Sequence, residues 1–597
     1  MARDVGLVRL SGEVVWLCNT RDVLGGSQAE LFRRYVGPHR GQAGLLAVLL
    51  LSSIVLQLIN PQLLRFFIDS ARAGADLEPL ALAALAFVVV ALATQLLAAF
   101  AQYLGEALGW AATNALRADL TLHCLQLDLG FHKDRTSGEL VERIDGDVTA
   151  LGGFFSRFVV NVLGNVALLM GVLFMVWRED WRAGIALSAF ALLALAVLLR
   201  LRNVAVSRWQ RVREVSAQLF GFFGERLAGT EDIRSSGAVA YVMRELGLHQ
   251  GAWLAARRGA VAGTSVIWSA TLVTFALGSA IAFVVGGSLW LAGAITLGTV
   301  YLLFYYTELL RRPIEQIRRE LDEMQQAFAG IARVQELLRV RSRLADGERS
   351  LPRGPLAVDF DEVSFAYAHD PVLRNVSVAI APARVLGLLG RTGSGKTTLA
   401  RLLLRFYDPA SGTVRLGGVD LREAALSDIR SRATMVTQDV QLFHASVRDN
   451  VTFFDRSIDD ARALAVLDQL DLGEWVRRRE AGLDAEMRTD TLSAGEAQLL
   501  AFARAFLRDP GLVILDEASS RLDPATERRI ERAIDTLLYG RTGVVIAHRL
   551  ETVERCDEIA ILDEGRVIEH GARLVLAADP SSRFATLLRS GLAEVLA

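Results

Sequence analysis

A glycine-rich run in the C-terminal half carries residue types that bind phosphate. Gly390–Thr398 follows the apolar run Val385–Leu389 and fits the pattern GxxxxGK[ST] between a buried strand and a helix. Glycines let backbone N–H groups approach phosphate oxygens, and the helix N-terminus adds a favourable dipole. The pattern predicts a nucleotide site, and its candidate ATP-binding residues are Gly390, Thr392, Gly393, Ser394, Gly395, Lys396, Thr397 and Thr398.

Two side chains of this loop have specific chemistry. Lys396 is placed to reach the β- and γ-phosphates, and the Thr397 hydroxyl is a candidate ligand for Mg²⁺. The chain holds 65 Lys plus Arg, of which only Lys133 and Lys396 are lysine. A lysine here is consistent with a need for a compact point charge. The expected cofactors are ATP and Mg²⁺.

A second candidate element is acidic. Leu512–Leu515 predicts a buried strand, and Asp516 and Glu517 follow at its carboxyl end, where open α/β sheets bind ligands. Asp516 is expected to hold Mg²⁺, and Glu517 to polarise the attacking water. The alternative, that both carboxylates only cap the next helix, is disfavoured by the glycine-rich loop.

The segment between these two elements carries a family resemblance. Thr491–Glu496 reads Thr-Leu-Ser-Ala-Gly-Glu and is similar to the LSGGQ signature of ABC ATPases. The resemblance implies that Ser493, Gly495 and Glu496 contact an ATP held by a partner domain.

Four further residues follow in the order of that family. The resemblance implies that Tyr367 stacks on adenine and that Gln438 senses the γ-phosphate and the metal. It also implies that Asp523 belongs to the D-loop and that His548 is the switch histidine at the γ-phosphate. Tyr367 or His548 alone is more often a packed core residue, so the order of the whole set carries the interpretation.

The N-terminal half contains several long uncharged stretches that are candidate membrane spans. A bilayer core of about 30 Å needs roughly 20 apolar residues in a helix. Uncharged stretches of that kind are Gly41–Leu64, Pro79–Gly105, Phe158–Trp177, the shorter Ala183–Leu199, and Gly259–Thr307, whose 49 residues fit two spans. Six spans are therefore predicted, the last two turning near Gly286, Gly287 and Gly293. A large buried helical core is the disfavoured alternative, and the charges near the span ends, such as Arg65 and Asp69, are read as interfacial.

The long segments after spans two and four are rich in arginine, which places them in the cytoplasm. An even number of spans then puts both termini and the ATPase domain there, in a multi-pass protein of a bacterial inner membrane. Two turns in these segments, Phe131–Leu140 and Glu225–Ile233, resemble the coupling segments of ABC exporters. From composition alone they are solvated polar turns. Gln28–Tyr35 is a candidate amphipathic helix on the membrane surface.

The predicted fold class is multi-domain: an all-α six-helix transmembrane domain followed by an α/β P-loop ABC ATPase domain. The expected segments are residues 1–38 with the amphipathic helix, 39–341 as the transmembrane domain, 342–354 as a linker and 355–597 as the nucleotide-binding domain. A net charge of -2 does not suggest a nucleic-acid partner, and three distant cysteines argue against a disulfide framework. The N-terminus lacks the apolar region of a cleavable signal peptide.

The resemblance covers nearly the whole chain and is to the exporter-type (type IV) half-transporters. It implies ATP hydrolysis coupled by alternating access to export of a hydrophobic or amphipathic compound such as a drug, lipid or peptide, with membrane lipid as a partner. An ATP-gated channel or regulator on the same scaffold, and an exporter-fold importer of a metal chelate, are the alternatives.

Several positions depart from the family pattern. Ala494 and Glu496 replace Gly and Gln in the signature, Arg521 replaces a small D-loop residue, and Met487 and Thr489 stand where Glu and Gly are common. The hydrolytic residues of the chain are intact, while its contribution to a partner's ATP is altered. The resemblance therefore favours a heterodimer with a second ABC half-transporter, with a homodimer as the alternative.

Overall fold

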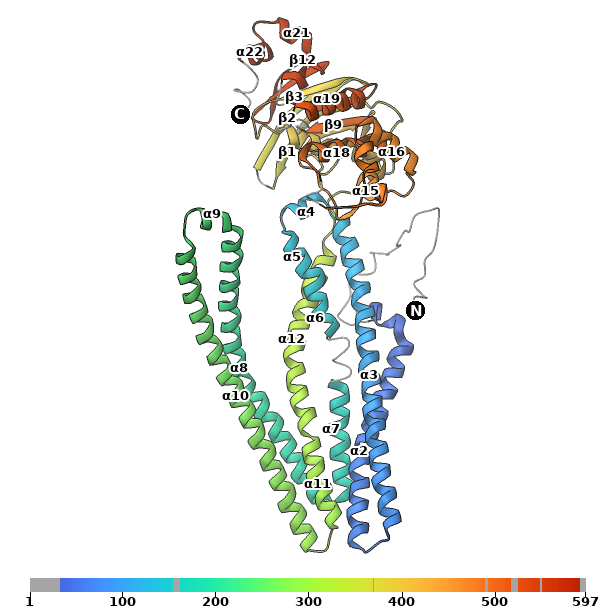
Figure 1. The fold of residues 1–597 in the computed structure, drawn as a ribbon, viewed down its shortest axis with the longest axis vertical. Helices are drawn as coiled ribbons and strands as arrows, with labels where there is room; N and C mark the ends of the chain where they lie inside the picture. Colours follow the sequence, from blue (N-terminus) through green and yellow to red (C-terminus); the bar gives the residue numbers. More distant parts are fainter. Residues whose placement is uncertain are drawn as a thin grey trace. The chain divides into compact units, whose positions relative to one another are not determined.

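The computed structural model describes residues 33–153, 162–368, 370–488, 492–516, 524–547 and 550–590. The chain divides into two compact units (Figure 1). The first comprises Met1–Gln126 and Arg135–Arg341, and the second comprises Leu127–Asp134 and Ser342–Ala597. A short piece of the N-terminal half, which contains helix α4 (Leu129–Lys133), therefore belongs to the C-terminal unit.

Helices make up the regular structure described in the first unit. They are η2 (Gly37–His39), α2 (Arg40–Arg72), α3 (Leu77–Gln126), α5 (Ser137–Val141), the π-helix η3 (Glu142–Asp147), α6 (Val148–Gly153), α7 (Gly164–Glu179), α8 (Trp181–Ala228), α9 (Thr230–Ser235), α10 (Val239–Leu291), α11 (Leu297–Leu309) and α12 (Arg311–Arg339). Helices α2 and α3 pack as one antiparallel pair, and α8 and α10 as another (Figure 1).

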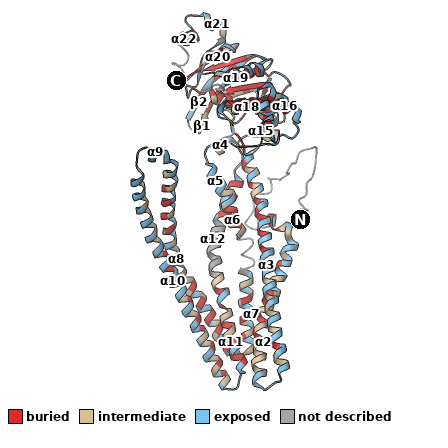
Figure 2. Ribbon diagram, in the orientation of Figure 1, coloured by how far each residue is buried: buried red, intermediate tan, exposed pale blue. Residues whose placement is uncertain are grey.

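Within the residues that the structure describes, four helical stretches are long and apolar enough to cross a membrane: Gly37–Arg72, Leu77–Gln126, Trp181–Leu198 and Val239–Leu291. Figure 2 shows exposed residues along much of α2 and α3, and many of them are large and apolar, as a lipid-facing surface requires. The predicted third span starts at residue 158, and its first residues lie outside the described part of the chain, as do residues 28–32 of the predicted amphipathic helix.

The last two predicted spans are divided differently from the expectation. Helix α10 continues through Gly286 and Gly287 to Leu291, and the turn lies at Gly293, where φ is +70°. Gly286 instead permits close packing, because a Cβ there would lie 3.2 Å from Val300 Cγ1 of α11. From the start of α11 to Thr307 the helix covers only about 16 Å. A sixth span that crosses the bilayer must therefore continue beyond the uncharged stretch.

A polar cluster joins α2, α7 and α11 at the end of the helices where that turn lies. Arg65 Nη1 donates to Glu179 Oε2 at 2.6 Å. Asp69 accepts hydrogen bonds from the Thr296 hydroxyl at 2.7 Å and from the backbone N–H of Gly298 at 2.9 Å. Asp69 therefore stabilises the N-terminus of α11, where N–H groups would otherwise lack partners. The charges that the sequence suggested to be interfacial hold three helices together.

The second unit is an α/β fold. Besides α4, its elements are β1 (Val358–Tyr367), β2 (Asp370–Ile380), β3 (Val385–Leu389), α13 (Lys396–Leu403), β4 (Ser411–Leu416), β5 (Val419–Asp420), α14 (Leu426–Arg432), β6 (Ala433–Val436), β7 (Ala445–Ser446), α15 (Val447–Thr452), α16 (Asp460–Gln469), α17 (Gly473–Arg477), η5 (Gly482–Asp484), β8 (Glu486–Met487), α18 (Ala494–Arg508), β9 (Leu512–Asp516), α19 (Pro524–Leu538), β10 (Thr542–Ile546), α20 (Leu550–Glu554), β11 (Glu558–Asp563), β12 (Arg566–Ala572), α21 (Arg573–Ala578) and α22 (Arg583–Ser590).

The main sheet of this unit has the strand order β12-β11-β3-β10-β9-β6, with only β12 antiparallel to its neighbour. A four-stranded antiparallel sheet, β2-β1-β4-β5, and the two-stranded pair β7-β8 complete it. Parallel strands covered on both faces are apolar along their whole length, which explains the runs in β3 and β9.

The two faces of the main sheet belong to different apolar layers. Val513 and Leu515 of β9 pack in the layer that includes α18 and α19, whereas Leu512 and Ile514 pack in the layer that includes β1, β2 and α13. Cys556 lies in the first layer, and burial raises the pKa of its thiol to about 12. The core therefore fixes both faces of the central strands.

A buried arginine ties the start of this unit to its sheets. The Arg405 side chain is 2% exposed. Its guanidinium donates to the carbonyl oxygens of Ala345 at 2.8 Å and Ala424 at 3.3 Å, and to Asp408 Oδ1 at 3.0 Å. These bonds link the segment before β1 to the chain that follows α13 and β5.

We predict that Arg405→Ala destabilises the second unit by about 3 kcal/mol, because removing one partner of a buried ion pair leaves polar groups unsatisfied. Thermal unfolding of the full-length protein, with limited proteolysis after Ser342, measures the effect. Arg374→Ala on the exposed face of β2 is the matched control. Equal unfolding temperatures for the two variants would contradict the structural role of Arg405.

Candidate nucleotide site and membrane cavity

The glycine-rich loop connects β3 to α13, in the strand–loop–helix order that the sequence predicts. Gly390 and Gly395 have φ values of +145° and +108°, which favour glycine. A Cβ at Gly390 would lie 2.2 Å from the carbonyl oxygen of Leu562, and a Cβ at Gly395 would lie 2.6 Å from Leu373 Cδ2. The loop needs glycine at both positions for reasons of backbone geometry as well as of phosphate access.

The Lys396 side chain lies inside this loop. The residue is 6% exposed, and its ammonium donates to the carbonyl oxygens of Gly390 at 2.5 Å and Arg391 at 3.0 Å. The Ser394 hydroxyl is also buried and has no hydrogen-bond partner among the described residues. A buried polar atom without a partner fits a loop that binds an anion.

The structure brings the loop together with the acidic strand end. Strand β10 pairs in parallel with both β3 and β9, so the carboxyl ends of these strands share one edge. Thr397 Oγ1 lies 3.5 Å from Asp516 Oδ2. Gln438 comes two residues after β6, the other neighbour of β9. Hydroxyl, carboxylate and amide oxygens are a donor set that Mg²⁺ accepts.

Tyr367 is the last residue of β1, and its hydroxyl lies beside α13, the helix that follows the glycine-rich loop. Its hydroxyl lies 3.4 Å from Thr398 Oγ1 and accepts a hydrogen bond from Arg401 Nη1 at 3.2 Å. On the ring itself, the Lys133 ammonium of α4 lies 3.8 Å from the centroid, a cation–π contact. Tyr367 and Lys133 border a cavity of about 650 Å³. Sequence analysis missed this contact, because no local pattern pairs residues so far apart in the chain.

Helix α4 is part of the first predicted coupling turn, and its own contacts explain why it belongs to the second unit. Asp128 caps α4 by accepting from the Phe131 N–H at 3.1 Å, and its other oxygen accepts from the Arg343 N–H at 2.8 Å. The second predicted turn lies at α9 in the first unit, and its residues are largely exposed.

The signature segment starts α18 with a capping box. Ser493 is the N-cap residue, and its Oγ accepts from the Glu496 N–H at 3.3 Å. The Glu496 carboxylate in turn accepts from the Ser493 N–H at 2.9 Å and from its hydroxyl at 2.8 Å. Gly495 is buried behind them. The Ser493 N–H and hydroxyl, two donors at this helix N-terminus, are therefore engaged by the chain's own carboxylate.

Several predicted residues lie outside the described part of the chain. Glu517 and Asp523 fall between Asp516 and Pro524, and His548 follows Ala547. Arg521, Thr489 and Thr491 also lie outside the described part of the chain. Met487 is described and is fully buried in the β8 strand. The structure therefore places the glycine-rich loop, Asp516 and the signature segment, and the roles of these residues stay predictions, as do those of Glu517 and His548.

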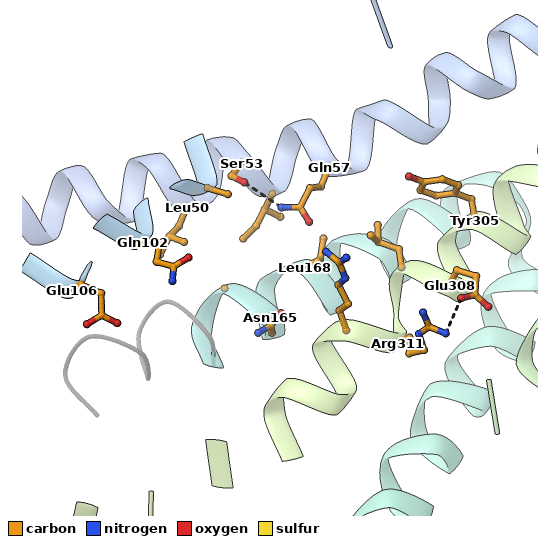
Figure 3. Close-up of a pocket in the computed structure, with 15 residues that line it drawn as sticks. Leu50, Ser53, Gln57, Gln102, Glu106, Asn165, Leu168, Tyr305, Glu308 and Arg311 are labelled. Carbon is orange, nitrogen blue, oxygen red and sulfur yellow. Dashed lines mark hydrogen bonds and ion pairs between the residues drawn. The ribbon is translucent and has the colours of Figure 1, made fainter. Parts of the chain in front are cut away.

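The first unit contains a cavity of about 710 Å³ within its helices (Figure 3). Residues from α2, α3, α7, α11 and α12 line it: Leu50, Ser53, Ile54, Gln57, Ala98, Gln102, Glu106, Gly164, Asn165, Leu168, Tyr305, Glu308, Leu309, Arg311 and Arg312. In Figure 3 the amides of Gln57, Gln102 and Asn165 reach toward one space from three helices. The cavity combines apolar walls with polar groups.

The sequence did not point to Glu308, Arg311 and Arg312 of this lining, because the last predicted span ended at Thr307. Glu308 Oε2 lies 3.6 Å from Arg311 Nη1, and Glu308 Oε1 accepts a hydrogen bond from the Ser279 hydroxyl at 3.0 Å. A count of residues from the turn at Gly293 would have found them, since the uncharged remainder is too short for a span.

Comparisons with known proteins agree with this architecture. A family model described as the ABC transporter transmembrane region matches residues 44–314, and one described as ABC transporter matches residues 373–520. The uncharacterized ABC transporter ATP-binding protein YknV of Bacillus subtilis is 30% identical over 468 residues, which cover 76% of each chain. This chain belongs to the ABC transporter family.

Other relatives cover more of this ABC transporter. An ATP-dependent lipid A-core flippase of Syntrophus aciditrophicus is 28% identical over 580 residues, covering 94% of both chains. A bacterial Atm1-family ABC exporter solved with ATP bound matches with a TM-score of 0.77 at 24% identity, over 94% of this chain and 98% of the other, and shows the same fold.

The comparisons confirm three predictions. The chain has the exporter-type half-transporter organisation, its fold is a helical transmembrane region followed by an α/β ABC ATPase domain, and its enzymatic activity is ATP hydrolysis coupled to transport. The chain binds ATP and is an integral membrane protein.

We predict that Lys396→Ala lowers the affinity for MgATP by about 10- to 100-fold, the range expected when a charge-assisted hydrogen bond to phosphate is lost. Equilibrium binding of a fluorescent ATP analogue to the purified full-length protein measures it. Arg566→Ala, on an exposed position of β12, controls for loss of a positive charge. An unchanged dissociation constant for Lys396→Ala would remove this lysine from the nucleotide site.

Proposed function

We propose that this chain is one half of a dimeric ABC exporter, which uses ATP to move a hydrophobic or amphipathic compound across a bacterial inner membrane. The observation that carries the proposal is the shared sheet edge at which Lys396, Thr397 and Asp516 meet, in a chain whose other unit has membrane-crossing helices. The resemblance to relatives named lipid A-core flippases supports an amphipathic substrate.

In this proposal Gly390–Thr398 binds the phosphates of ATP, and Tyr367 contacts the adenine. Thr397, Asp516 and Gln438 hold Mg²⁺, which neutralises charge that develops on the transferred phosphoryl group. The proximity of Thr397 to Asp516 supports this assignment.

The hydrolytic step is assigned to Glu517 and His548. Glu517 comes directly after the strand that ends in Asp516, and this position in the chain supports a role in orienting the attacking water. His548 follows β10, the strand between β3 and β9, and is assigned to the γ-phosphate. The chain-order resemblance to ABC ATPases supports both roles.

The proposed domains are residues 1–38, 39–341, 342–354 and 355–597, with both termini and the ATPase domain in the cytoplasm. The excess of arginine in the long segments after spans two and four supports this orientation. The turns at 131–140 and 225–233 are assigned to coupling between ATP hydrolysis and alternating access. The packing of Asp128 and Lys133 within the ATPase unit supports the first assignment.

The proposed partner is a different half-transporter, so that the two nucleotide sites of the dimer would differ. The capping box at α18 supports this difference. Ser493 would serve an ATP bound to the partner, but its N–H and hydroxyl both donate to Glu496. A phosphate approaching this helix N-terminus would meet a carboxylate and be repelled. This chain would thus complete a weak site with the partner's nucleotide, while its own loop and Glu517 form the efficient site with the partner's signature.

We predict that Glu517→Gln lowers the ATPase rate by about 10²- to 10⁴-fold and leaves ATP binding intact, because the water loses its positioning carboxylate. The measurements are the phosphate release rate and the nucleotide occupancy of the assembled transporter. Glu554→Gln, exposed at the end of α20, is the matched control. Normal turnover in Glu517→Gln would exclude the catalytic role.

We predict that this chain expressed alone hydrolyses ATP slowly and that Glu496→Gln raises this rate, since the amide removes the charge beside Ser493. Phosphate release by the purified chain, with and without a co-expressed second half-transporter, measures it. A wild-type homodimer that transports as fast as any mixed assembly would overturn the heterodimer.

A further inference from the structure

The cavity of Figure 3 holds charged residues at the depth of the bilayer. Arg312 lies about 22 Å along the helical path from the start of α11 at Leu297, within a hydrocarbon core of about 30 Å. At the same end of the bundle the Arg72 guanidinium lies 5.4 Å from the Trp290 ring, a pairing suited to a membrane interface. Ionisable residues at such depth are costly and mark substrate pathways.

The acidic residues of the cavity do not neutralise Arg312. Glu308 is engaged by Ser279 and by Arg311, its neighbour one turn along the helix. Glu106 lies about 43 Å along α3 from Leu77, beyond the hydrocarbon core and at its cytoplasmic side. Among the described residues the Arg312 side chain has no hydrogen bond or ion pair, and the residue is exposed to the cavity.

The cavity that Arg312 lines has polar groups suited to the headgroup of an amphiphile and apolar groups suited to its hydrocarbon chain. The Gln57 and Gln102 amides supply hydrogen-bond donors, and Leu50, Ile54 and Leu168 supply apolar wall. A planar guanidinium matches the oxygens of a phosphate or carboxylate, with which it forms charge-assisted bonds. The volume is that of a small-molecule site.

We propose that this cavity selects amphiphiles with an acidic headgroup, phosphate or carboxylate, which Arg312 binds while the apolar chain packs against α2 and α7. The inference rests on the proposed function, because it assigns the transported class to the membrane unit. A cationic amphiphile would add to the positive charge at this depth, and a neutral one would leave Arg312 without a counter-charge.

The test compares amphiphiles that share one alkyl chain: dodecyl phosphate, dodecyl maltoside and dodecyltrimethylammonium. The assembled transporter is reconstituted in phosphatidylcholine nanodiscs, and each compound is titrated against ATPase stimulation and tryptophan quenching. The expected order of half-saturating concentrations places dodecyl phosphate lowest, by about tenfold, since one charge-assisted hydrogen bond is at stake. Dodecanoate extends the test to the carboxylate.

Two substitutions locate the effect. Arg312→Gln is expected to raise the half-saturating concentration of dodecyl phosphate by about tenfold, and Arg312→Lys to restore part of it by retaining the charge. Arg178→Gln, exposed at the end of α7 and outside the cavity lining, is the matched control and should leave the titration unchanged.

The outcomes separate this inference from the proposed function. Stimulation by all three compounds without headgroup preference, or an unchanged titration in Arg312→Gln, would overturn the acidic selectivity and leave amphiphile export standing. ATP hydrolysis that responds to no amphiphile, with no transport of any of them, would overturn the proposed function itself. Preference for dodecyltrimethylammonium would reverse the assigned charge.

Discussion

The register of three parallel strands sets the position of the nucleotide chemistry. Strands β3, β10 and β9 are paired residue by residue along buried apolar sequence, so their carboxyl ends coincide. A shift by one residue would move Val513 and Leu515 from one apolar layer to the other. The same core packing that stabilises the sheet therefore fixes the distance between Thr397 and Asp516. The geometry of the candidate nucleotide site depends on the register of these apolar strands.

Most of the nucleotide site and the presence of membrane spans could be predicted, because the sequence patterns that indicate them are local. The runs Val385–Leu389 and Leu512–Leu515, the glycine-rich loop and the apolar spans each occupy a continuous stretch of sequence. The contacts that the sequence did not reveal join distant segments. The Lys133 ammonium over the Tyr367 ring is one, and the ion pair between Arg65 and Glu179 is another. Periodicity and composition describe local stretches of sequence, so they do not indicate which distant residues will pair.

The predicted end of the sixth span was wrong for a different reason. The rule that a span is uncharged ended it at Thr307, although the turn at Gly293 leaves too short a helix before that residue. Length, fixed by the bilayer, had to take precedence over composition. Glycine misled in the same region, because Gly286 serves helix packing and only Gly293 has the left-handed backbone of a turn.

Two charged residues in this chain present opposite electrostatic situations. Glu496 is satisfied within its own capping box, so the N-terminus of α18 meets any incoming phosphate with negative charge already in place. Arg312 has no hydrogen bond or ion pair among the described residues and lines the cavity of the membrane unit, so an anion that entered this cavity would supply its counter-charge. A carboxylate that is hydrogen-bonded only to neutral donors keeps its charge and repels a ligand of like charge, whereas an arginine without a counter-charge attracts a ligand of opposite charge. If both proposals hold, the chain would discourage one anion, the nucleotide of a partner, and attract another within its membrane unit.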